Sequence, residues 1–244
     1  RQRQMCIRDS AMTPAIELIA IEKRFGAVHA NRNVSLRIDP ASVHGIVGEN
    51  GAGKSTLMSI VYGFYEADSG EIRIKGKPVR IRSSQDAISH GIGMVHQHFM
   101  LVETMTVLEN VILGAEGGRL LAQGEKEARA ALADLGRRYG LKVDPDAIVG
   151  DLTVGLQQRV EIIKALYRGA DILILDEPTA VLTPSEADQL FELTKALKAQ
   201  GKTVILITHK LREIMHATDK VSVMRRGEVV ACLLYTSPSP RDRG

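Results

Sequence analysis

The 244-residue sequence is poor in cysteine, has no tryptophan and contains no long apolar run. Its two cysteines, Cys6 and Cys232, lie near the two ends, so the body of the chain has neither a disulfide nor a thiolate metal site. This usage is consistent with a reducing compartment. No apolar run approaches the length of about 18 residues that a bilayer span requires, and no charged-then-apolar signal segment opens the chain. We therefore expect a protein that does not itself cross a membrane.

Residues 11–231 also lack an excess of charge of either sign. The formal net charge of the whole chain is +3. Residues 1–10 hold three arginines and one aspartate, and residues 232–244 hold two arginines and one aspartate, so the ends account for the entire excess. A neutral body offers no domain-wide basic surface to nucleic acid, and we expect no nucleic-acid partner.

The same two ends differ from the rest in sequence pattern. Residues 1–10 show no apolar period, and residues 232–244 interrupt a strand pattern and finish in Ser-Pro repeats. Both resemble translated linker sequence, so we expect them to be non-native tails. Residues 11–231 are long enough to bury a full core, and we expect one large domain there.

The chain is organised around a glycine-rich loop at residues 48–56. It fits the phosphate-binding pattern of Gly, four free residues, Gly-Lys and Ser or Thr. Glycine is needed because backbone N–H groups must approach phosphate oxygens closely. Residues 43–47 predict a strand before the loop, and residues 55–62 predict a helix whose N-terminus attracts anions. Lys54 reaches the β- and γ-phosphates, and the Ser55 hydroxyl is a ligand for Mg²⁺. The residues expected to hold the nucleotide are Gly48, Asn50, Gly51, Ala52, Gly53, Lys54, Ser55 and Thr56.

Two acidic residues follow a strongly apolar strand pattern. Residues 172–175 are four apolar residues in succession, which predicts a strand buried on both faces of a parallel sheet. Asp176 and Glu177 come next, at the strand end where open α/β sheets bind ligands. In most proteins two such acids form a solvated turn. Beside a phosphate loop, they favour a site in which one carboxylate holds Mg²⁺ through water and the other orients or deprotonates an attacking water.

A histidine follows the next buried strand. Residues 203–208 predict that strand, and His209 stands directly after it. A lone histidine is usually a surface or packing residue, but this one is expected at the same sheet edge as the acid pair, which favours contact with the γ-phosphate. Between the two strands, residues 183–186 form a capping box and predict a helix that runs to about Gln200.

The remaining segments predict a small antiparallel sheet and a helical insertion in an α/β protein. Residues 16–21, 34–38 and 71–77 alternate or are rich in β-formers. Residues 106–140 are helical in pattern and interrupt the β-α rhythm. Residues 221–231 predict a closing hairpin.

Three weaker candidates remain open from residue type alone. Phe25 is either a packing residue at a strand end or an aromatic that stacks on a nucleotide base. His96 and His98 are compatible with a His-x-His metal site, but without a third ligand nearby, local packing or surface exposure is favoured. Gly155 precedes a helix expected at residues 160–167 and marks either a helix cap or a second anion site.

Five motifs in order along the chain carry a family resemblance: the phosphate loop, Gln97, Leu152 to Gln158, the Asp176-Glu177 strand end and His209. Together they resemble the nucleotide-binding domain of ATP-binding cassette (ABC) transporters, over essentially residues 15–231. The resemblance implies a P-loop NTPase with a RecA-like parallel-sheet core, an antiparallel β subdomain, and an α-helical subdomain inserted at about residues 100–160. The implied activity is ATP hydrolysis coupled to transport, with ATP and Mg²⁺.

The resemblance also implies a role for each motif. Phe25 would stack on adenine, and residues 51–56 would wrap the phosphates. Gln97 would sense Mg²⁺ and couple to the membrane subunit. Thr153 and Gly155 would bind nucleotide as part of the signature. The implied catalytic residues are Lys54, Gln97, Glu177 as general base and His209 as γ-phosphate switch, and the implied metal residues are Ser55, Gln97 and Asp176, the last through water.

Two departures from the usual motifs of the family narrow the resemblance to one group of its members. The family signature is usually Leu-Ser-Gly-Gly-Gln, and residues 152–156 here read Leu-Thr-Val-Gly-Leu, so Val154 replaces a glycine. Thr183 stands where the dimer-contact loop usually has aspartate. Together with residues 94–101, these departures look like the first of two cassettes joined in one chain, as in bacterial nucleoside or simple-sugar importers. This chain would then be a fragment.

In that family, ATP lies between the phosphate loop of one cassette and the signature of another. The implied partners are a second nucleotide-binding domain, transmembrane permease subunits and, indirectly, a solute-binding protein. The implied location is the cytoplasmic face of the inner membrane, as a peripheral protein. Two alternatives stay open: a soluble ABC ATPase that acts on ribosomes or nucleic acid, and a non-hydrolysing regulatory module, which Val154 and Thr183 make conceivable.

Overall fold

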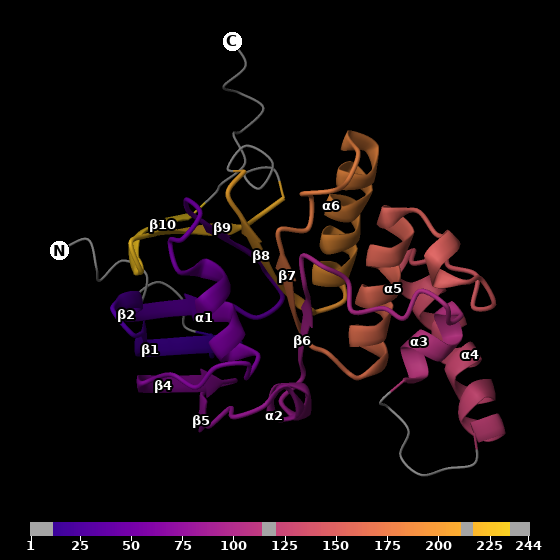
Figure 1. The fold of residues 1–244 in the computed structure, drawn as a ribbon, viewed down its shortest axis with the longest axis horizontal. Coiled ribbons are helices and arrows are strands. Elements are labelled where there is room, and N and C mark those ends of the chain that lie inside the picture. The colour runs from indigo at the N-terminus through magenta and orange to yellow at the C-terminus, as the bar shows by residue number, and fades with distance from the viewer. Residues whose placement is uncertain (1–11, 114–120, 211–216, 235–244) are drawn as a thin grey trace.

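The computed structural model describes residues 12–113, 121–210 and 217–234, which form two sheets surrounded by helices (Figure 1). The strands are β1 (Ile16–Phe25), β2 (Val28–Ile38), β3 (Val43–Val47), β4 (Ser69–Ile74), β5 (Lys77–Val79), β6 (Ile92–Val95), β7 (Ile172–Asp176), β8 (Thr203–Thr208), β9 (Lys220–Arg225) and β10 (Glu228–Leu234). One sheet has the order β2-β1-β4-β5 and is antiparallel, and the other has the order β10-β9-β3-β8-β7-β6. The predicted α/β class is confirmed.

The six-stranded sheet brings several strand ends to one edge. Strands β3, β8, β7 and β6 run parallel, and their apolar residues are buried because both faces of the sheet are covered. The register pairs Val47 with Thr208, and Asp176 with Ile207. The residues that follow these strands therefore emerge side by side at the carboxyl edge, where the phosphate loop also begins.

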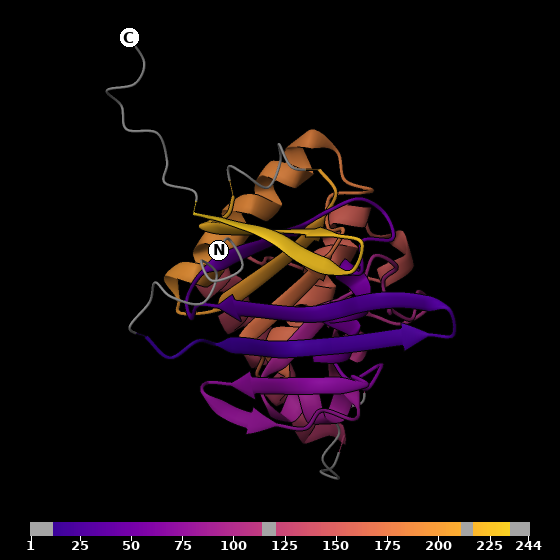
Figure 2. The same cartoon turned by 90° about the vertical axis from the view of Figure 1, so that its left-hand side faces the viewer.

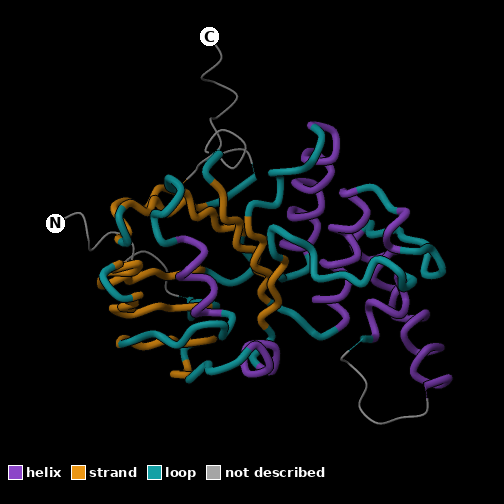
Figure 3. Tube along the Cα trace, viewed as in Figure 1, coloured by secondary structure: helices purple, strands orange, loops and turns teal. Residues whose placement is uncertain are grey.

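Helices cover the parallel sheet on both faces (Figures 1 and 3). The helices are α1 (Lys54–Val61), α2 (Ser84–Ser89), α3 (Val107–Ile112), α4 (Leu121–Tyr139), α5 (Val154–Tyr167) and α6 (Pro184–Ala199). Helix α1 packs between the two sheets, whereas α3, α4, α5 and α6 pack on the opposite face of the parallel sheet. None of these helices in the described part of the chain is long and apolar enough to cross a membrane.

The antiparallel sheet forms the other wall of the core around α1 (Figure 2). Its alternating residues Ile16, Leu18 and Ile21 are fully buried, as are Leu57 and Met58 of α1. Burial of such side chains stabilises each by roughly 1.5–3 kcal/mol relative to exposure. The alternation that predicted these strands therefore reflects one face packed on α1 and one face toward solvent.

Several element boundaries differ from the sequence prediction: β1 and β2 are longer than the expected 16–21 and 34–38, and the expected strand 71–77 is divided into β4 and β5. Helix α5 begins at Val154, six residues before the expected start, because the Thr153 hydroxyl accepts the Leu156 N–H and caps it. Strand β10 continues to Leu234, into the segment expected to be a tail, because residues 232–234 pair with β9. The other tail residues and residues 114–120 lie outside the described residues.

His44 on β3 predicts a dependence of stability on pH. Its ring is buried, Nε2 is 2.8 Å from the Ser222 hydroxyl, and Nδ1 has no partner. Burial lowers the pKa of His44 to about 4. At a pH between about 4 and the ordinary value of about 6.5, the unfolded chain therefore binds a proton at His44 and the folded chain does not. The free energy of unfolding is unaffected by His44 above a pH of about 6.5 and decreases as the pH falls toward about 4.

Replacement of His44 with glutamine is expected to flatten the pH dependence of the free energy of unfolding by about 3 kcal/mol over that range. Urea unfolding at a series of pH values measures it. Replacement of the exposed His98 with glutamine is the control. An equal slope in both variants would contradict the assignment to His44.

Candidate functional site

The phosphate loop is held tightly between the two sheets. It joins β3 to α1, and Gly53 has a φ of 96°. A Cβ on Gly53 would overlap the Ala30 carbonyl of β2, and a Cβ on Gly48 would overlap the Met224 carbonyl of β9. Glycine is required at both positions because neighbouring backbone occupies the space of a side chain.

Lys54 lies inside this loop. It is the first residue of α1, is buried, and its Nζ donates to the carbonyl oxygens of Gly48 at 2.8 Å and Glu49 at 3.0 Å. Burial lowers the pKa of Lys54, while the nearby carboxylates of Glu177 and Asp176 raise it. The ammonium therefore lies within the electrostatic reach of both acids.

Ser55 and Asp176 connect the loop to the parallel sheet. The Ser55 hydroxyl donates to Asp176 Oδ1 at 3.3 Å. Burial raises the pKa of Asp176, as does the charge of Glu177, while Ser55 and Lys54 lower it. A hydroxyl and a carboxylate are oxygen ligands that suit Mg²⁺, which takes few protein ligands and completes its shell with water and phosphate oxygens. The described residues include no cluster of three or more histidine, cysteine or acidic side chains, as an all-protein site would need.

Glu177 is held by four hydrogen bonds in an unusual backbone conformation, and one of them runs from the Ala180 N–H to the Glu177 carbonyl at 3.1 Å. Its φ is 47°, which is rare for a residue with a side chain. Its N–H donates to the Ile207 carbonyl at 2.8 Å, and Thr208 Oγ1 donates to Oε2 at 3.2 Å. His209 Nδ1 lies 3.0 Å from Oε1, so the acid and the imidazole meet at the carboxyl edge. Such local strain persists only where surrounding contacts fix it, as at functional sites.

The structure thus brings Lys54, Ser55, Asp176, Glu177 and His209 together. Gln97 is exposed in the loop that follows β6, two residues after Val95, which pairs with Leu175 of β7, so this loop begins beside the strand that carries the acid pair. Among the described residues no hydrogen bond joins the Gln97 side chain to the Ser55–Asp176 pair.

Phe25 lies at the end of β1, away from these side chains in sequence. It is 42% exposed, its ring makes an edge contact with Tyr65 at 5.1 Å between centroids, and Lys23 Nζ lies 5.4 Å above it. The ring is therefore both packed and accessible, so base stacking stays a prediction.

The signature residues belong to a different surface. Thr153 caps α5, and Gly155 follows in its first turn. A Cβ on Gly155 would lie 2.6 Å from Glu186 Oε1, so the backbone passes close to α6. With Arg159 and Gln189 they line a cavity of about 160 Å³ between α5 and α6. Helix α5 packs on the face of the parallel sheet opposite α1, and the signature is not part of the Lys54–Glu177 cluster.

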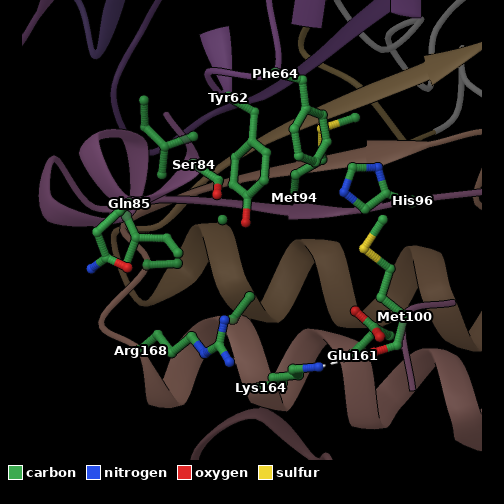
Figure 4. Close-up of a pocket in the computed structure, with 15 residues that line it drawn as sticks. Tyr62, Phe64, Ser84, Gln85, Met94, His96, Met100, Glu161, Lys164 and Arg168 are labelled. Atoms are coloured by element: carbon green, nitrogen blue, oxygen red, sulfur yellow. Dashed lines mark hydrogen bonds between the residues drawn. The ribbon is translucent and has the colours of Figure 1, made fainter. Parts of the chain in front are cut away.

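A second cavity, of about 260 Å³, separates α2 and β6 from α5 (Figure 4). Its wall includes Glu161, which is only 5% exposed, and Glu161 Oε1 has no partner. Burial raises the pKa of Glu161. Arg168 contributes a buried Nε that is also unpartnered. Figure 4 shows Tyr62 entering from one side and Glu161, Lys164 and Arg168 from the other.

His96 borders the same cavity. Its ring packs against Phe64 at 5.2 Å and Tyr62 at 5.9 Å between centroids. Burial lowers its pKa. Local packing, which the sequence favoured over a His-x-His metal site, is what the structure gives His96.

Sequence reasoning did not predict the contacts of four polar side chains that the structure places near these sites: Gln158, Glu161, Glu186 and Thr208. The available signal for two of them was polarity on a helix face otherwise occupied by Ile162, Ala165 and Leu166. Gln158 and Glu161 are buried there, three residues apart.

Comparisons with known proteins agree with the family resemblance of the sequence motifs. Residues 31–180 match the family model described as ABC transporter. The chain is 52% identical to the nucleoside import ATP-binding protein NupA of Lactococcus lactis, over 88% of this chain and 42% of that protein. It is 50% identical to the guanosine import ATP-binding protein NupO of Bacillus subtilis, over 91% and 44%. The chain thus spans less than half the length of these relatives.

Solved structures give the same likeness. A nucleotide-free ATP-binding cassette from an ABC transporter superposes with a TM-score of 0.82 at 27% identity, covering 93% of this chain and 96% of that one. The ADP conformation of MJ1267, an ATP-binding cassette of an ABC transporter, gives 0.81 at 29% identity, covering 91% of each.

Proposed function

Because the chain belongs to the ABC transporter family, we propose that it binds ATP with Mg²⁺, hydrolyses it, and powers import of a nucleoside or simple sugar through a membrane permease. The family and the P-loop NTPase fold, both predicted from the motif order, are confirmed. The observation that carries the catalytic proposal is the meeting of Lys54, Asp176, Glu177 and His209 at one sheet edge. The solute class is supported by the names of the relatives, which describe nucleoside, guanosine and ribose import.

The chain's own residues divide the catalytic work. Lys54 supplies a buried ammonium to phosphate oxygens at a helix N-terminus. Glu177 accepts a proton from the attacking water, while His209 and Thr208 hold its carboxylate oxygens. Ser55 and Asp176 would hold Mg²⁺, which when bound neutralises charge that develops on the transferred phosphoryl group.

The two departures from the family pattern suit the local structure. Thr183 caps α6, with its hydroxyl accepting the Glu186 N–H at 3.3 Å, and threonine and aspartate are both good N-caps. Val154 is exposed in the first turn of α5. Thr183 thus keeps the start of α6 capped as an aspartate would, and the departure at this position is compatible with a hydrolytic cassette.

The position of the signature supports a second cassette as partner. Thr153 and Gly155 start a helix on the other face of the sheet from α1, so we propose that they serve a nucleotide held by another cassette. A chain that spans less than half of its relatives leaves room for that cassette in the same native protein.

We assign permease docking to the cavity of Figure 4, since β6 and His96 line it and Gln97 is the next residue in the sequence. The unpartnered Glu161 Oε1 and Arg168 Nε offer hydrogen bonds to an incoming segment. Docking there holds the cassette at the cytoplasmic face of the membrane as a peripheral subunit. A solute-binding protein then acts through the permease alone.

Replacement of Glu161 with glutamine is expected to raise the melting temperature, because a buried carboxylate is retained at a cost to stability. Burial holds its pKa above the ordinary value, so ionisation costs stability as the pH rises. The gain should be larger at about pH 8 than at about pH 5. Thermal unfolding measures it, with the exposed Glu192→Gln as control. A gain in melting temperature from Glu161→Gln that is no larger at about pH 8 than at about pH 5 would refute the idea.

Two assays test the proposed function as a whole. Phosphate release from Mg²⁺-ATP by the chain joined to a second cassette tests hydrolysis. Uptake of labelled guanosine and of labelled ribose, measured in separate arms, tests import in cells that express the full-length gene together with a membrane permease. Hydrolysis without uptake of either solute would leave an ATPase and remove the importer assignment.

The remaining alternative is a soluble ABC ATPase that acts on ribosomes or nucleic acid. The zero net charge of residues 11–231 and the transport names of the relatives oppose it. It predicts RNA or DNA binding that weakens steeply with salt. Filter binding at two salt concentrations decides between the two functions.

A further inference from the structure

Helix α5 is hydrogen-bonded to the segment that follows the catalytic acid. Gln158 is 3% exposed, and its Nε2 donates to the Pro178 carbonyl at 2.8 Å. Pro178 is the residue after Glu177 and has no N–H, so this carbonyl is its one backbone hydrogen-bonding group. The bond therefore joins the signature helix of the chain to the peptide unit next to its proposed general base.

The same segment is tied to α5 again at its other end. Glu186 closes the capping box of α6 by accepting the Thr183 N–H at 3.0 Å. Its carboxylate also accepts the Gly155 N–H. Residues 178–186 are thus held to the first two turns of α5 at both ends. These bonds connect the start of α5 to the segment that follows Glu177.

Glu177 is sensitive to such a shift because of its backbone. Its φ of 47° is sparsely populated and is fixed on one side by the bond from its N–H to Ile207. On the other side the Glu177 carbonyl accepts the Ala180 N–H at 3.1 Å, and the Gln158–Pro178 bond holds the next peptide group of the same turn. Loss of the Gln158–Pro178 bond weakens the hold on this turn, and relaxation of the turn toward a less strained conformation would rotate the Glu177 carboxylate.

We propose that Gln158 is a positioning residue, which holds Pro178 so that the Glu177 carboxylate stays aligned for proton abstraction and responds to contacts made at the start of α5. This inference rests on the proposed function. In this proposal one chain connects two nucleotide sites. The signature at the start of α5 contacts the nucleotide of the second cassette, and Gln158 connects the signature helix to Glu177, which acts on the chain's own nucleotide.

The test compares two identical substitutions one residue apart. Gln158→Met keeps the length of the side chain and removes the donor. Gln157→Met is the matched control, because Gln157 Nε2 donates to Val149 at 3.1 Å and Leu152 at 3.4 Å, away from Pro178. Phosphate release from Mg²⁺-ATP gives kcat and KM for each full chain, and a fluorescent ATP analogue gives nucleotide affinity.

Gln158→Met is expected to lower kcat by about 10- to 100-fold, since a small misplacement of a catalytic group costs that much. KM and nucleotide affinity should be unchanged, and Gln157→Met should match the unsubstituted chain. In a Glu177→Gln background, Gln158→Met should add no further loss, because its effect passes through that carboxylate. A merely structural role would lower kcat in both backgrounds.

The outcomes separate this inference from the proposed function. Equal kcat in the Gln158→Met and Gln157→Met chains overturns the role of Gln158 alone. Absence of phosphate release from the unsubstituted chain joined to a second cassette overturns the proposed function, and this inference with it. Should Gln158→Met fail to fold, Gln158→Asn, which keeps the amide one methylene shorter, must show the kcat loss with normal nucleotide affinity, and a normal kcat there overturns the inference equally.

Discussion

Replacement of Glu177 with glutamine is expected to lower ATP hydrolysis by about 10²–10⁴-fold, the usual contribution of a general base. Glutamine has almost the same shape, and its amide still reaches Thr208 and His209. It has no basic carboxylate to accept a proton from water. Nucleotide binding should therefore persist, and the variant should hold ATP without turning it over. Phosphate release and binding of a fluorescent ATP analogue measure the two effects separately.

The control for this variant is Glu192→Gln on α6, where the carboxylate is exposed and pairs only with Lys195. It loses the same charge far from the proposed site and should hydrolyse ATP normally. Phosphate release from Glu177→Gln at the rate of the unsubstituted chain would remove Glu177 as the general base. A loss of nucleotide binding in the same variant would instead assign Glu177 to binding.

Replacement of Lys54 with alanine is expected to weaken nucleotide binding itself, by about 10- to 100-fold. A hydrogen bond to a charged group is worth about 1.5–3 kcal/mol, and the ammonium is the cation inside the phosphate loop. The carbonyls of Gly48 and Glu49 also lose their donor, so the loop is expected to bind phosphate less well even where it keeps its shape. Titration with the fluorescent ATP analogue measures the change in Kd.

Lys195→Ala provides the matched control, because this lysine is exposed on α6 and pairs only with Glu192. Comparison of melting temperatures separates loss of binding from loss of fold. Unchanged nucleotide affinity in a folded Lys54→Ala chain would sink the assignment of the phosphate loop.

The residues at the carboxyl edge could be predicted because each follows a signal that is local in sequence. Asp176, Glu177 and His209 directly follow buried strands, and parallel strands place their ends at one edge. The glycine pattern around Lys54 is likewise contained in nine residues. A reader of the sequence needs only the strand order to bring these side chains together.

The contacts of α5 could not be predicted in the same way. Gln158 meets Pro178, twenty residues further along, and Glu186 meets Gly155 across two helices. Which polar side chain fills a helix–helix contact depends on packing angle and depth, which sequence periodicity does not encode. The late start expected for α5 has a related cause: its first turn holds Gly155 and Val154, which are poor helix formers, and a threonine cap outweighs them.

The roles of Gln97 and Phe25 could not be predicted from local sequence patterns. Gln97 is exposed beyond β6 and Phe25 is half-exposed at the end of β1, so their roles depend on groups that approach from outside. The family resemblance gives each a role, and the described contacts are compatible with it. Their assignments remain predictions that nucleotide titration of Phe25→Ala and Gln97→Ala can address.

The lack of clearance around Gly48 and Gly53 bears on attempts to transplant the nucleotide cradle. Residues 48–56 take their shape from carbonyls of β2 and β9, which belong to different sheets. A graft of the nine residues onto another strand–helix junction would carry the motif without the neighbouring strands that fix its conformation. We therefore expect nucleotide affinity to depend on β2 and β9 as well as on the loop, and a design that transfers the loop has to include equivalents of both strands.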